Sequence, residues 1–263
     1  MPTAPVVGGL EGEVALVTGG WRGIGAAVCR AFAVQGALVA VNYPPRSEPA
    51  RQGAVRLVDE LRAGGAGAMA VEADVSDRRA VFTMVDLVAS GLGAVGILVA
   101  NAAASARMPW TTIDEDEWDR VMRVNVTGTL LCAQAVYPAM RDRGRGKIIT
   151  VSSVMVELGS SNALHYVTSK AALIGLTRSL AREVGRDGIC VNCVMPGAIR
   201  TEQEEEMFPG AAAQTAREQA VRQSVPRRGM AEDLAGAFVY LASSASDFVS
   251  GQVVVVDGGW VNY

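Results

Sequence analysis

The stretch TGGWRGIG, residues 18–25, lies at the junction of two apolar segments of different character. EVALVTGG (13–20) predicts a β-strand, and GIGAAVCRAFAVQG (23–36) predicts a helix that ends at a glycine. Glycines at such a junction permit a tight turn, let the backbone approach a pyrophosphate and aim a helix N-terminus at it. Their spacing here is G-x-x-x-G-x-G, formed by Gly19, Gly23 and Gly25. The stretch therefore predicts a dinucleotide-binding turn in an α/β fold.

The rest of the chain alternates short apolar runs with longer helical stretches. Strand-like runs occupy 13–20, 37–43, 67–75, 96–104, 146–153, 188–197 and 251–259. Helices are predicted at 23–36, 47–65, 76–91, about 114–140, about 163–185 and near 231–243. Strands this apolar predict a seven-stranded parallel sheet that is covered by helices on both faces. Right-handed crossovers then give a Rossmann-type, doubly wound α/β arrangement.

The chain shows no internal repeat, linker or low-complexity tract, so a single Rossmann-type domain over residues 1–263 is expected, with residues 1–10 flexible. A polar and then alanine-rich segment, about 197–228, follows the carboxyl end of a predicted strand. Such ends form the ligand crevices of α/β sheets. We expect a substrate lid there, with a passive surface loop as the alternative. Its acidic run, Glu204 to Glu206, is typical of a solvated face.

Composition excludes several classes of function. The net charge of -3 gives no electrostatic reason to expect a nucleic-acid or membrane partner. The first ten residues lack the features of a signal peptide, and no apolar stretch approaches the roughly 18 residues that span a bilayer. CVNC (190–193) lies in a strand-like run whose alternation separates the two sulfurs, and the chain has one histidine, so no metal site is expected. These features favour a cytoplasmic protein.

The end of the second predicted strand bears on the choice of nicotinamide cofactor. In NAD-binding proteins a carboxylate about twenty residues after the turn accepts hydrogen bonds from the ribose and repels a 2′-phosphate. Asn42 and Tyr43 stand there instead, and Arg22 and Arg46 bring positive charge nearby. Because a guanidinium suits phosphate, NADP(H) is favoured, with NAD(H) possible. Asp74, after the third strand, is either an acceptor for the adenine amine or a helix cap.

Catalytic chemistry is indicated by SNALHYVTSKAALIG, residues 160–174, which places Tyr166 one helical turn before Lys170. Residues i and i+4 share a helix face, so the ammonium is expected to lie near the phenol and to lower its pKa from about 10. A phenol tuned in this way suits general acid–base catalysis. Ser153 ends a neighbouring strand and offers a hydroxyl to a substrate carbonyl. The alternatives are a surface Tyr–Lys pair and a strand-end turn serine.

From Val14 to about Gly259 the chain resembles the short-chain dehydrogenase/reductase family, in its 3-oxoacyl-carrier-protein reductase and secondary-alcohol dehydrogenase branches. The matching pieces are TGGWRGIG (18–25), DV (74–75), ANAA (100–103), Asn125 in RVNVTG, Ser153 in VSS, Y-x-x-x-K (166–170), PGAIRT (196–201) and the closing VVVVDGG. Each piece is short, but together and in this order they are specific. Ala103 departs from the pattern, because the family commonly has glycine there.

The resemblance implies hydride exchange between a nicotinamide and a carbonyl or secondary-alcohol carbon of a small molecule. It implies that Tyr166 donates or accepts the proton, Lys170 also binds the nicotinamide ribose, Ser153 polarises the substrate and Asn125 supports a proton relay through water. The alternative for Asn125 is a buried polar bridge between helices. It further implies a homo-oligomer, typically a tetramer. With the residues above, the expected cofactor-binding set is Gly19, Trp21, Arg22, Gly23, Ile24, Gly25, Asn42, Tyr43, Arg46, Asp74, Val75, Asn101, Ala102, Ala103, Tyr166, Lys170, Pro196, Gly197, Ile199 and Thr201.

An NADP(H)-dependent ketone reductase or secondary-alcohol dehydrogenase is thus the leading interpretation. An NAD(H)-dependent secondary-alcohol or sugar dehydrogenase is the nearest alternative. A non-catalytic dinucleotide-sensing module has no need of Tyr166, Lys170 and Ser153 together. Sugar-nucleotide epimerases of the extended branch share the glycine turn but usually carry a longer C-terminal substrate domain. The sequence leaves the physiological substrate and the direction of reaction open.

Overall fold

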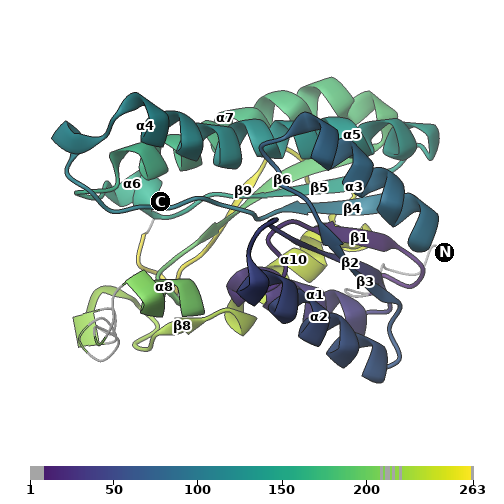
Figure 1. Cartoon of the computed structure of the whole chain (residues 1–263), viewed down its shortest axis with the longest axis horizontal. Helices are drawn as coiled ribbons and strands as arrows, with labels where there is room; N and C mark the ends of the chain where they lie inside the picture. Colours follow the sequence, from purple (N-terminus) through teal and green to yellow (C-terminus); the bar gives the residue numbers. More distant parts are fainter. Residues whose placement is uncertain (1–8, 208–209, 211–213, 215–216, 219–220, 262–263) are drawn as a thin grey trace.

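A computed structural model describes residues 9–207, 210, 214, 217–218 and 221–261. Residues 1–8 of the segment predicted to be flexible lie outside this range. Within the described residues, seven parallel strands form one sheet in the order β3-β2-β1-β4-β5-β6-β9 (Figure 1). The predicted doubly wound sheet is confirmed. The strands are β1 (Val14–Val17), β2 (Leu38–Tyr43), β3 (Ala68–Glu72), β4 (Val95–Ala100), β5 (Gly146–Val151), β6 (Ile189–Pro196) and β9 (Val253–Val256).

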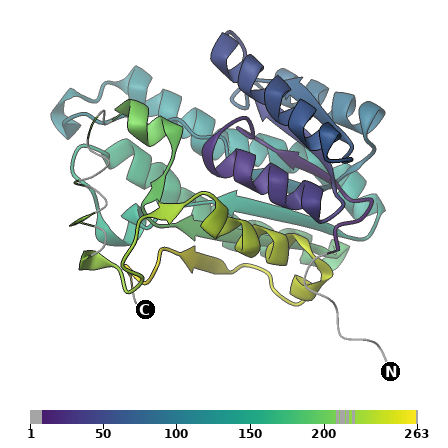
Figure 2. The same cartoon turned by 90° about the horizontal axis from the view of Figure 1, so that it is seen from below.

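Helices cover both faces of this sheet. One face carries α3 (Arg78–Gly91), α4 (Glu115–Met122), α5 (Gly128–Asp142) and α7 (Leu164–Val184), and the other carries α1 (Gly23–Val34), α2 (Glu48–Ala63) and α10 (Glu232–Ala242). Seen from below, α1 and α10 lie side by side against the sheet (Figure 2). Each face has its own apolar core, with Phe32 and Phe238 fully buried in one and Met84 and Met140 in the other. The strands are apolar throughout because both of their faces are covered.

Smaller elements gather at the carboxyl ends of the strands. They are α6 (Met155–Leu158), α8 (Glu202–Met207) and a two-stranded ribbon of β7 (Ile199–Arg200) and β8 (Gly229–Met230). In Figure 1, α8 and β8 lie on the lower left, on the same side of the sheet as α1. They belong to the segment predicted as a lid, of which residues 208–209, 211–213, 215–216 and 219–220 lie outside the described range.

Side-chain caps explain where two helices begin. Ser47 Oγ accepts a hydrogen bond of 3.3 Å from Ala50 N at the start of α2. Asp77 Oδ1 accepts one of 2.8 Å from Ala80 N at the start of α3. Such caps satisfy backbone donors that have no partner within the helix. The cap of α3 is therefore Asp77, and the helix-cap alternative considered for Asp74 is wrong.

Two elements differ from the sequence expectation in an informative way. The strand predicted over 96–104 ends at Ala100, because the backbone N–H groups of Asn101 and Ala102 both donate to Thr18 Oγ1 at 3.0 Å instead of extending the ladder. The helix predicted over about 114–140 is observed as α4 and α5 joined by a π-helical turn, Arg123–Thr127. Turns of this kind are rare and often occur at functional sites.

The topology locates the ligand crevice. The chain runs outward from β1 to β2 and β3 and then returns to β4 on the other side of β1, so the crossovers on either side of β1 cover opposite faces. A ligand crevice forms at the carboxyl ends of the strands where the winding reverses in this way. The glycine-rich turn, which directly follows β1, lies at that point.

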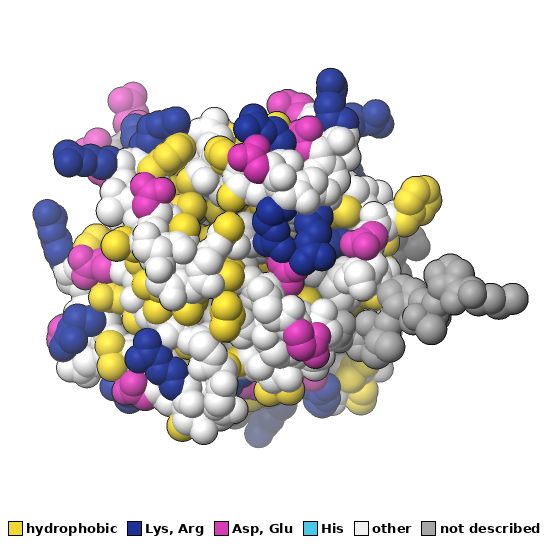
Figure 3. All heavy atoms as spheres, turned by 90° about the vertical axis from the view of Figure 1, so that its right-hand side faces the viewer, with side chains coloured by type: hydrophobic (Ala, Val, Ile, Leu, Met, Phe, Trp, Pro, Cys, Tyr) yellow, Lys and Arg dark blue, Asp and Glu magenta, His cyan; other side chains and the backbone are white. Residues whose placement is uncertain are grey.

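The outer surface shows no marked electrostatic polarity on the face drawn in Figure 3. Basic and acidic side chains lie interspersed there among hydrophobic and uncharged ones. Among the helices that the structure describes, none combines the length and apolarity needed to cross a membrane.

Candidate active site

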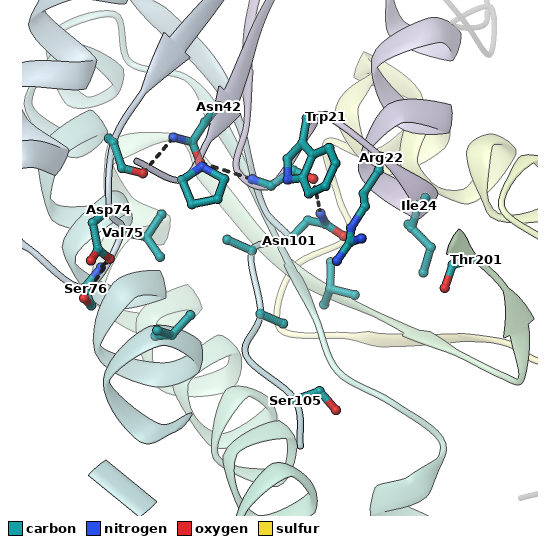
Figure 4. Close-up of a pocket in the computed structure, with 18 of the residues that line it drawn as sticks. Trp21, Arg22, Ile24, Asn42, Asp74, Val75, Ser76, Asn101, Ser105 and Thr201 are labelled. Atoms are coloured by element: carbon teal, nitrogen blue, oxygen red, sulfur yellow. Dashed lines mark hydrogen bonds between the residues drawn. The ribbon is translucent and has the colours of Figure 1, made fainter. Parts of the chain in front are cut away.

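A cleft of about 970 Å³ opens at the carboxyl ends of the central strands (Figure 4). It brings together residues of the segments that follow β1 and β4, residues at the ends of β2, β3, β5 and β6, and residues of α1, α4, α7 and α8. The predicted residues that line it are Gly19, Trp21, Arg22, Gly23, Ile24, Asn42, Arg46, Asp74, Val75, Asn101, Ala102, Ala103, Ser153, Tyr166, Lys170, Pro196, Gly197, Ile199 and Thr201. Gly25, Tyr43 and Asn125 were expected in the site but do not line the cleft.

The glycine-rich turn is sterically tight. Gly19 has a φ of +60°, and a Cβ there would lie 3.0 Å from the Cα of Ala102. A Cβ on Gly25 would lie 2.5 Å from the Gly19 carbonyl oxygen and 2.8 Å from Asn101 Nδ2. Gly25 is thus needed for turn and helix to close on each other, although it does not face the cleft. The backbone can therefore approach a pyrophosphate at the N-terminus of α1, and the cradle fits a dinucleotide.

Two asparagine amides hold this turn in place. Asn101 Nδ2 donates to the carbonyl oxygens of Thr18 at 3.0 Å and Gly19 at 3.2 Å. Asn42 Oδ1 accepts from Gly19 N at 3.1 Å, and its Nδ2 donates to Ala73 O at 3.1 Å. Figure 4 shows both amides directed at the backbone around the turn. Asn42 is buried, and its amide is already committed to joining the ends of β1, β2 and β3. It positions the turn at the edge of the cleft.

Of the side chains expected near the cofactor ribose, one packs into the core and three line the cleft. Tyr43 is partly buried and packs against the core on the α1 and α2 face, away from the cleft. Arg22 reaches the cleft and lies over the ring of Trp21, with its Cζ 4.4 Å from the ring centroid. Arg46 also lines the cleft, with a φ of +57° in the sterically restricted left-handed region. Asp74 stands at the cleft edge, where its Oδ1 accepts from Ser76 N at 2.8 Å.

Ser153, Tyr166 and Lys170 all line the cleft. The Ser153 side chain acts to lower the pKa of the Tyr166 phenol. The buried Lys170 ammonium donates to Val151 O at 2.8 Å and lies 5.7 Å from the centroid of the Tyr166 ring. Ser152 Oγ donates to Lys170 O at 2.9 Å, which ties α7 to the end of β5. The surface-pair alternative for Tyr166 and Lys170 is therefore wrong.

The electrostatics of this cluster differ from the sequence expectation. Burial raises the pKa of Tyr166 above its usual value, while the Ser153 side chain and the positive charge of Arg107 act to lower this pKa. The expectation that Lys170 makes the phenol acidic is wrong here, because the ammonium is directed at the Val151 carbonyl. Burial also lowers the pKa of Lys170 to about 8.

Asn125 lies in the π-helical turn and is buried behind the cleft wall. Its Oδ1 accepts from Ala104 N at 2.7 Å, and its Nδ2 donates to Ala104 O at 3.0 Å and to Ser169 Oγ at 2.9 Å. Ser169 Oγ in turn donates to the carbonyl oxygen of Tyr166 at 2.7 Å. Asn125 therefore fixes the segment after β4 against the helix that carries Tyr166 and Lys170.

Among the residues near the cleft that were not identified from the sequence are Ser105, Arg107 and Glu202. Ser105 lines the cleft on the segment after β4. Arg107, on the same segment, donates to Ser160 Oγ at 2.7 Å and places its charge near Tyr166. Glu202 of α8 accepts a hydrogen bond of 3.0 Å from Gly23 N. No motif marks these residues, and their roles follow only from contacts between distant segments.

A doubly wound sheet, a glycine-rich turn and a Ser–Tyr–Lys cluster in one crevice define a Rossmann-type dinucleotide-binding class of protein. The sequence profile of a family described as enoyl-(acyl carrier protein) reductase matches residues 19–261. The 3-oxoacyl-[acyl-carrier-protein] reductase FabG of Staphylococcus aureus is 36% identical over 246 residues, covering 93% of this chain and 96% of the relative. The chain belongs to the short-chain dehydrogenase/reductase family.

Solved structures agree with this assignment. A gluconate 5-dehydrogenase from Burkholderia cenocepacia J2315, in complex with NADP and tartrate, is 36% identical and superimposes with a TM-score of 0.87, with 96% of each chain covered. A blue fluorescent protein from a metagenomic library, in complex with NADPH, is 38% identical with a TM-score of 0.87, covering 96% of this chain and 99% of that one.

Proposed function

We propose that the protein is an NADP(H)-dependent oxidoreductase that interconverts a ketone and a secondary alcohol. The observation that carries this proposal is the meeting of Ser153, Tyr166 and Lys170 in the cleft that the glycine-rich turn also lines. The NADP and NADPH complexes of the two solved relatives support a nicotinamide cofactor for this chain as well.

The cleft offers a place for each part of the dinucleotide. The glycine-rich turn and the N-terminus of α1 suit the pyrophosphate, and Arg22 and Arg46 suit a 2′-phosphate. Lys170 would hold the nicotinamide ribose, with Ile199 and Thr201 at the nicotinamide end. When bound, the nicotinamide supplies or accepts the hydride at the substrate carbon.

The chain's own residues handle the substrate oxygen. In reduction, Tyr166 donates its proton to the carbonyl oxygen while Ser153 holds that oxygen by a hydrogen bond, and in oxidation Tyr166 accepts the proton. Because burial raises the pKa of Tyr166, the phenol keeps its proton at neutral pH, which suits proton donation to a ketone. Lys170, hydrogen-bonded to Val151 O, lies beside the Tyr166 ring in the cleft.

We also propose that the chain acts as a single oxidoreductase domain, and that the segment of about 197–228 is its substrate lid. The lid is supported by Gly197, Ile199, Thr201 and Glu202, which line the cleft from this segment. The family resemblance favours a homotetramer, and the sequence features described above favour a cytoplasmic location; both stay predictions.

Purified protein is expected to oxidise NADPH in the presence of a ketone and to prefer NADPH to NADH. Arg22→Ala is expected to weaken NADPH binding by roughly 10- to 100-fold, the range for hydrogen bonds between charged partners, and to leave NADH nearly unaffected. Steady-state rates with a ketone panel and both cofactors, together with fluorescence titrations, measure these effects.

Arg30→Ala is the matched control, since Arg30 pairs with Glu60 between α1 and α2, outside the cleft. It should change the affinity for neither cofactor. A wild-type preference for NADH would remove the phosphate role from Arg22 and Arg46 and favour the NAD(H)-dependent alternative.

Arg107→Gln is expected to move the pH profile of catalysis to higher pH. Ketone reduction needs the protonated phenol and falls as the pH rises through the pKa of Tyr166, whereas alcohol oxidation needs the phenolate and climbs over the same range. Because the charge of Arg107 lowers the pKa of Tyr166, its removal raises this pKa. The fall in reduction and the rise in oxidation should both move to higher pH. Profiles of kcat/KM against pH in both directions measure the shift.

Arg107→Lys retains the charge and should keep the wild-type profile. A limb that arises from Lys170, whose pKa lies at about 8, should stay in place because Arg107 has no part in that shift. Identical profiles for wild type and Arg107→Gln would exclude an electrostatic role for Arg107.

A further inference from the structure

Helix α8 is acidic, and its carboxylates are paired. Glu205 Oε1 accepts from Arg200 Nε at 2.6 Å, and Glu204 forms an ion pair with Arg228, so both bind α8 to the ribbon of β7 and β8. The side chains of Glu205 and Glu206 are exposed, as expected for a solvated face, whereas that of Glu204 is half-buried. Each carboxylate of this run has an arginine partner.

Two other carboxylates of α8 contact the glycine-rich turn. Glu202 and Glu206 are one helical turn apart and share one face of the helix. Glu202 Oε2 accepts from Gly23 N at 3.0 Å. Both carboxylate oxygens of Glu206 accept from Arg22 Nη1 at 2.8 Å. Two carboxylates of the lid segment thus contact two consecutive residues of the turn.

These contacts compete with those that the proposed function assigns to cofactor phosphates. The N–H of Gly23 carries one hydrogen, so it cannot serve a carboxylate and a pyrophosphate oxygen together. A 2′-phosphate on Arg22 would stand beside the Glu206 carboxylate, and like charges at that separation repel. Either the carboxylate moves away or the phosphate binds less tightly.

We infer that Glu202 and Glu206 set the affinity and selectivity of the cleft for its cofactor. Their carboxylates occupy the Gly23 N–H and the Arg22 guanidinium, and so compete with the cofactor phosphates for these donors. Glu202 acts on any dinucleotide, because it occupies a pyrophosphate donor. Glu206 acts selectively on the 2′-phosphorylated one, because it occupies Arg22. This inference rests on the proposed function, and in particular on Arg22 as the 2′-phosphate contact.

The exposure of the contacts indicates how strongly they compete. The Glu206 side chain is 64% exposed and that of Arg22 25% exposed, so a displaced Glu206 carboxylate moves readily into water. Ion pairs of this exposure are weak, and their loss corresponds to a change in affinity of about two- to fivefold. The carboxylates therefore moderate cofactor binding without preventing it.

Fluorescence titration of the full-length protein with NADPH and NADH tests the inference without relying on turnover. Glu206→Gln is expected to tighten NADPH binding by about two- to fivefold and to raise the ratio of NADPH to NADH affinity. Glu202→Gln is expected to tighten both cofactors. Glu205→Gln removes a charge from the same helix at a position that faces Arg200, and it should change neither affinity.

Equal affinities in wild type, Glu202→Gln and Glu206→Gln would overturn the inference. So would an equal gain in Glu205→Gln, because the effect would then follow the net charge of α8 and not these two contacts. The proposed function fails separately, if the wild type binds no nicotinamide cofactor or if Arg22→Ala leaves NADPH affinity unchanged.

Discussion

Tyr166→Phe is expected to lower kcat for ketone reduction by about 10²- to 10⁴-fold, the usual contribution of a positioned general acid. The substitution removes only the phenolic hydroxyl and leaves the ring in the cleft wall beside Ser153. Cofactor affinity should change little, because the glycine-rich turn and Arg22 remain as they are. Stopped-flow or steady-state kinetics and a cofactor titration on the same preparation separate the two effects.

Tyr137→Phe provides the matched control. Tyr137 lies on α5, where its hydroxyl donates to Asp187 Oδ2 at 2.9 Å outside the cleft. Its loss should leave kcat at the wild-type value. Near-normal turnover by Tyr166→Phe would end the proposed mechanism, whatever the cofactor titration showed.

Asn125→Ala is expected to lower the free energy of unfolding by roughly 2–5 kcal/mol, because buried hydrogen-bonding groups are left without partners. The truncation removes the partners of Ala104 N, Ala104 O and Ser169 Oγ in the buried wall behind the cleft. Urea denaturation followed by circular dichroism measures the loss. Turnover per folded molecule should also fall, because Asn125 positions the helix that carries Tyr166 and Lys170.

Asn192→Ala separates the two consequences. Asn192 is equally buried on β6, donates to Val249 O at 2.7 Å and accepts from Gln252 N at 3.1 Å, outside the cleft. It should lose stability while keeping turnover per folded molecule. An unfolding free energy for Asn125→Ala within about 0.5 kcal/mol of wild type, the range of ordinary surface substitutions, would contradict the role given to Asn125.

The order of elements and the cluster of motifs were predictable because they depend on local patterns. Apolar runs bounded by glycine located the strands to within a few residues, and the spacing of Tyr166 and Lys170 placed both on one helix face. The main error in strand length, at Ala100, arises from a side chain 82 positions earlier, since Thr18 Oγ1 takes the backbone donors that a longer strand would use. A local pattern does not contain that contact.

Side-chain partners were predicted less well than backbone elements, for the same reason. Asn42 was expected to bind ribose, yet its amide is committed to Gly19 and Ala73. Lys170 was expected to act on Tyr166, yet its ammonium is directed at Val151 O. Burial, which decides the direction of the Tyr166 pKa shift, depends on how the whole cleft is enclosed and not on the two residues alone.

The π-helical turn Arg123–Thr127 has a consequence for the two helices that it joins. A surplus residue within one turn rotates everything beyond it by about 100° about the helix axis. As a result α4 meets α7, whereas α5 meets α3 and β4, and each stretch aims its apolar stripe at a different neighbour. Deleting one residue from the turn would make α4 and α5 one continuous α-helix, but it would expose the apolar face of one of them to water. The loss in the free energy of unfolding would be that of removing the packing of a whole helix, and it would far exceed the loss from any single contact.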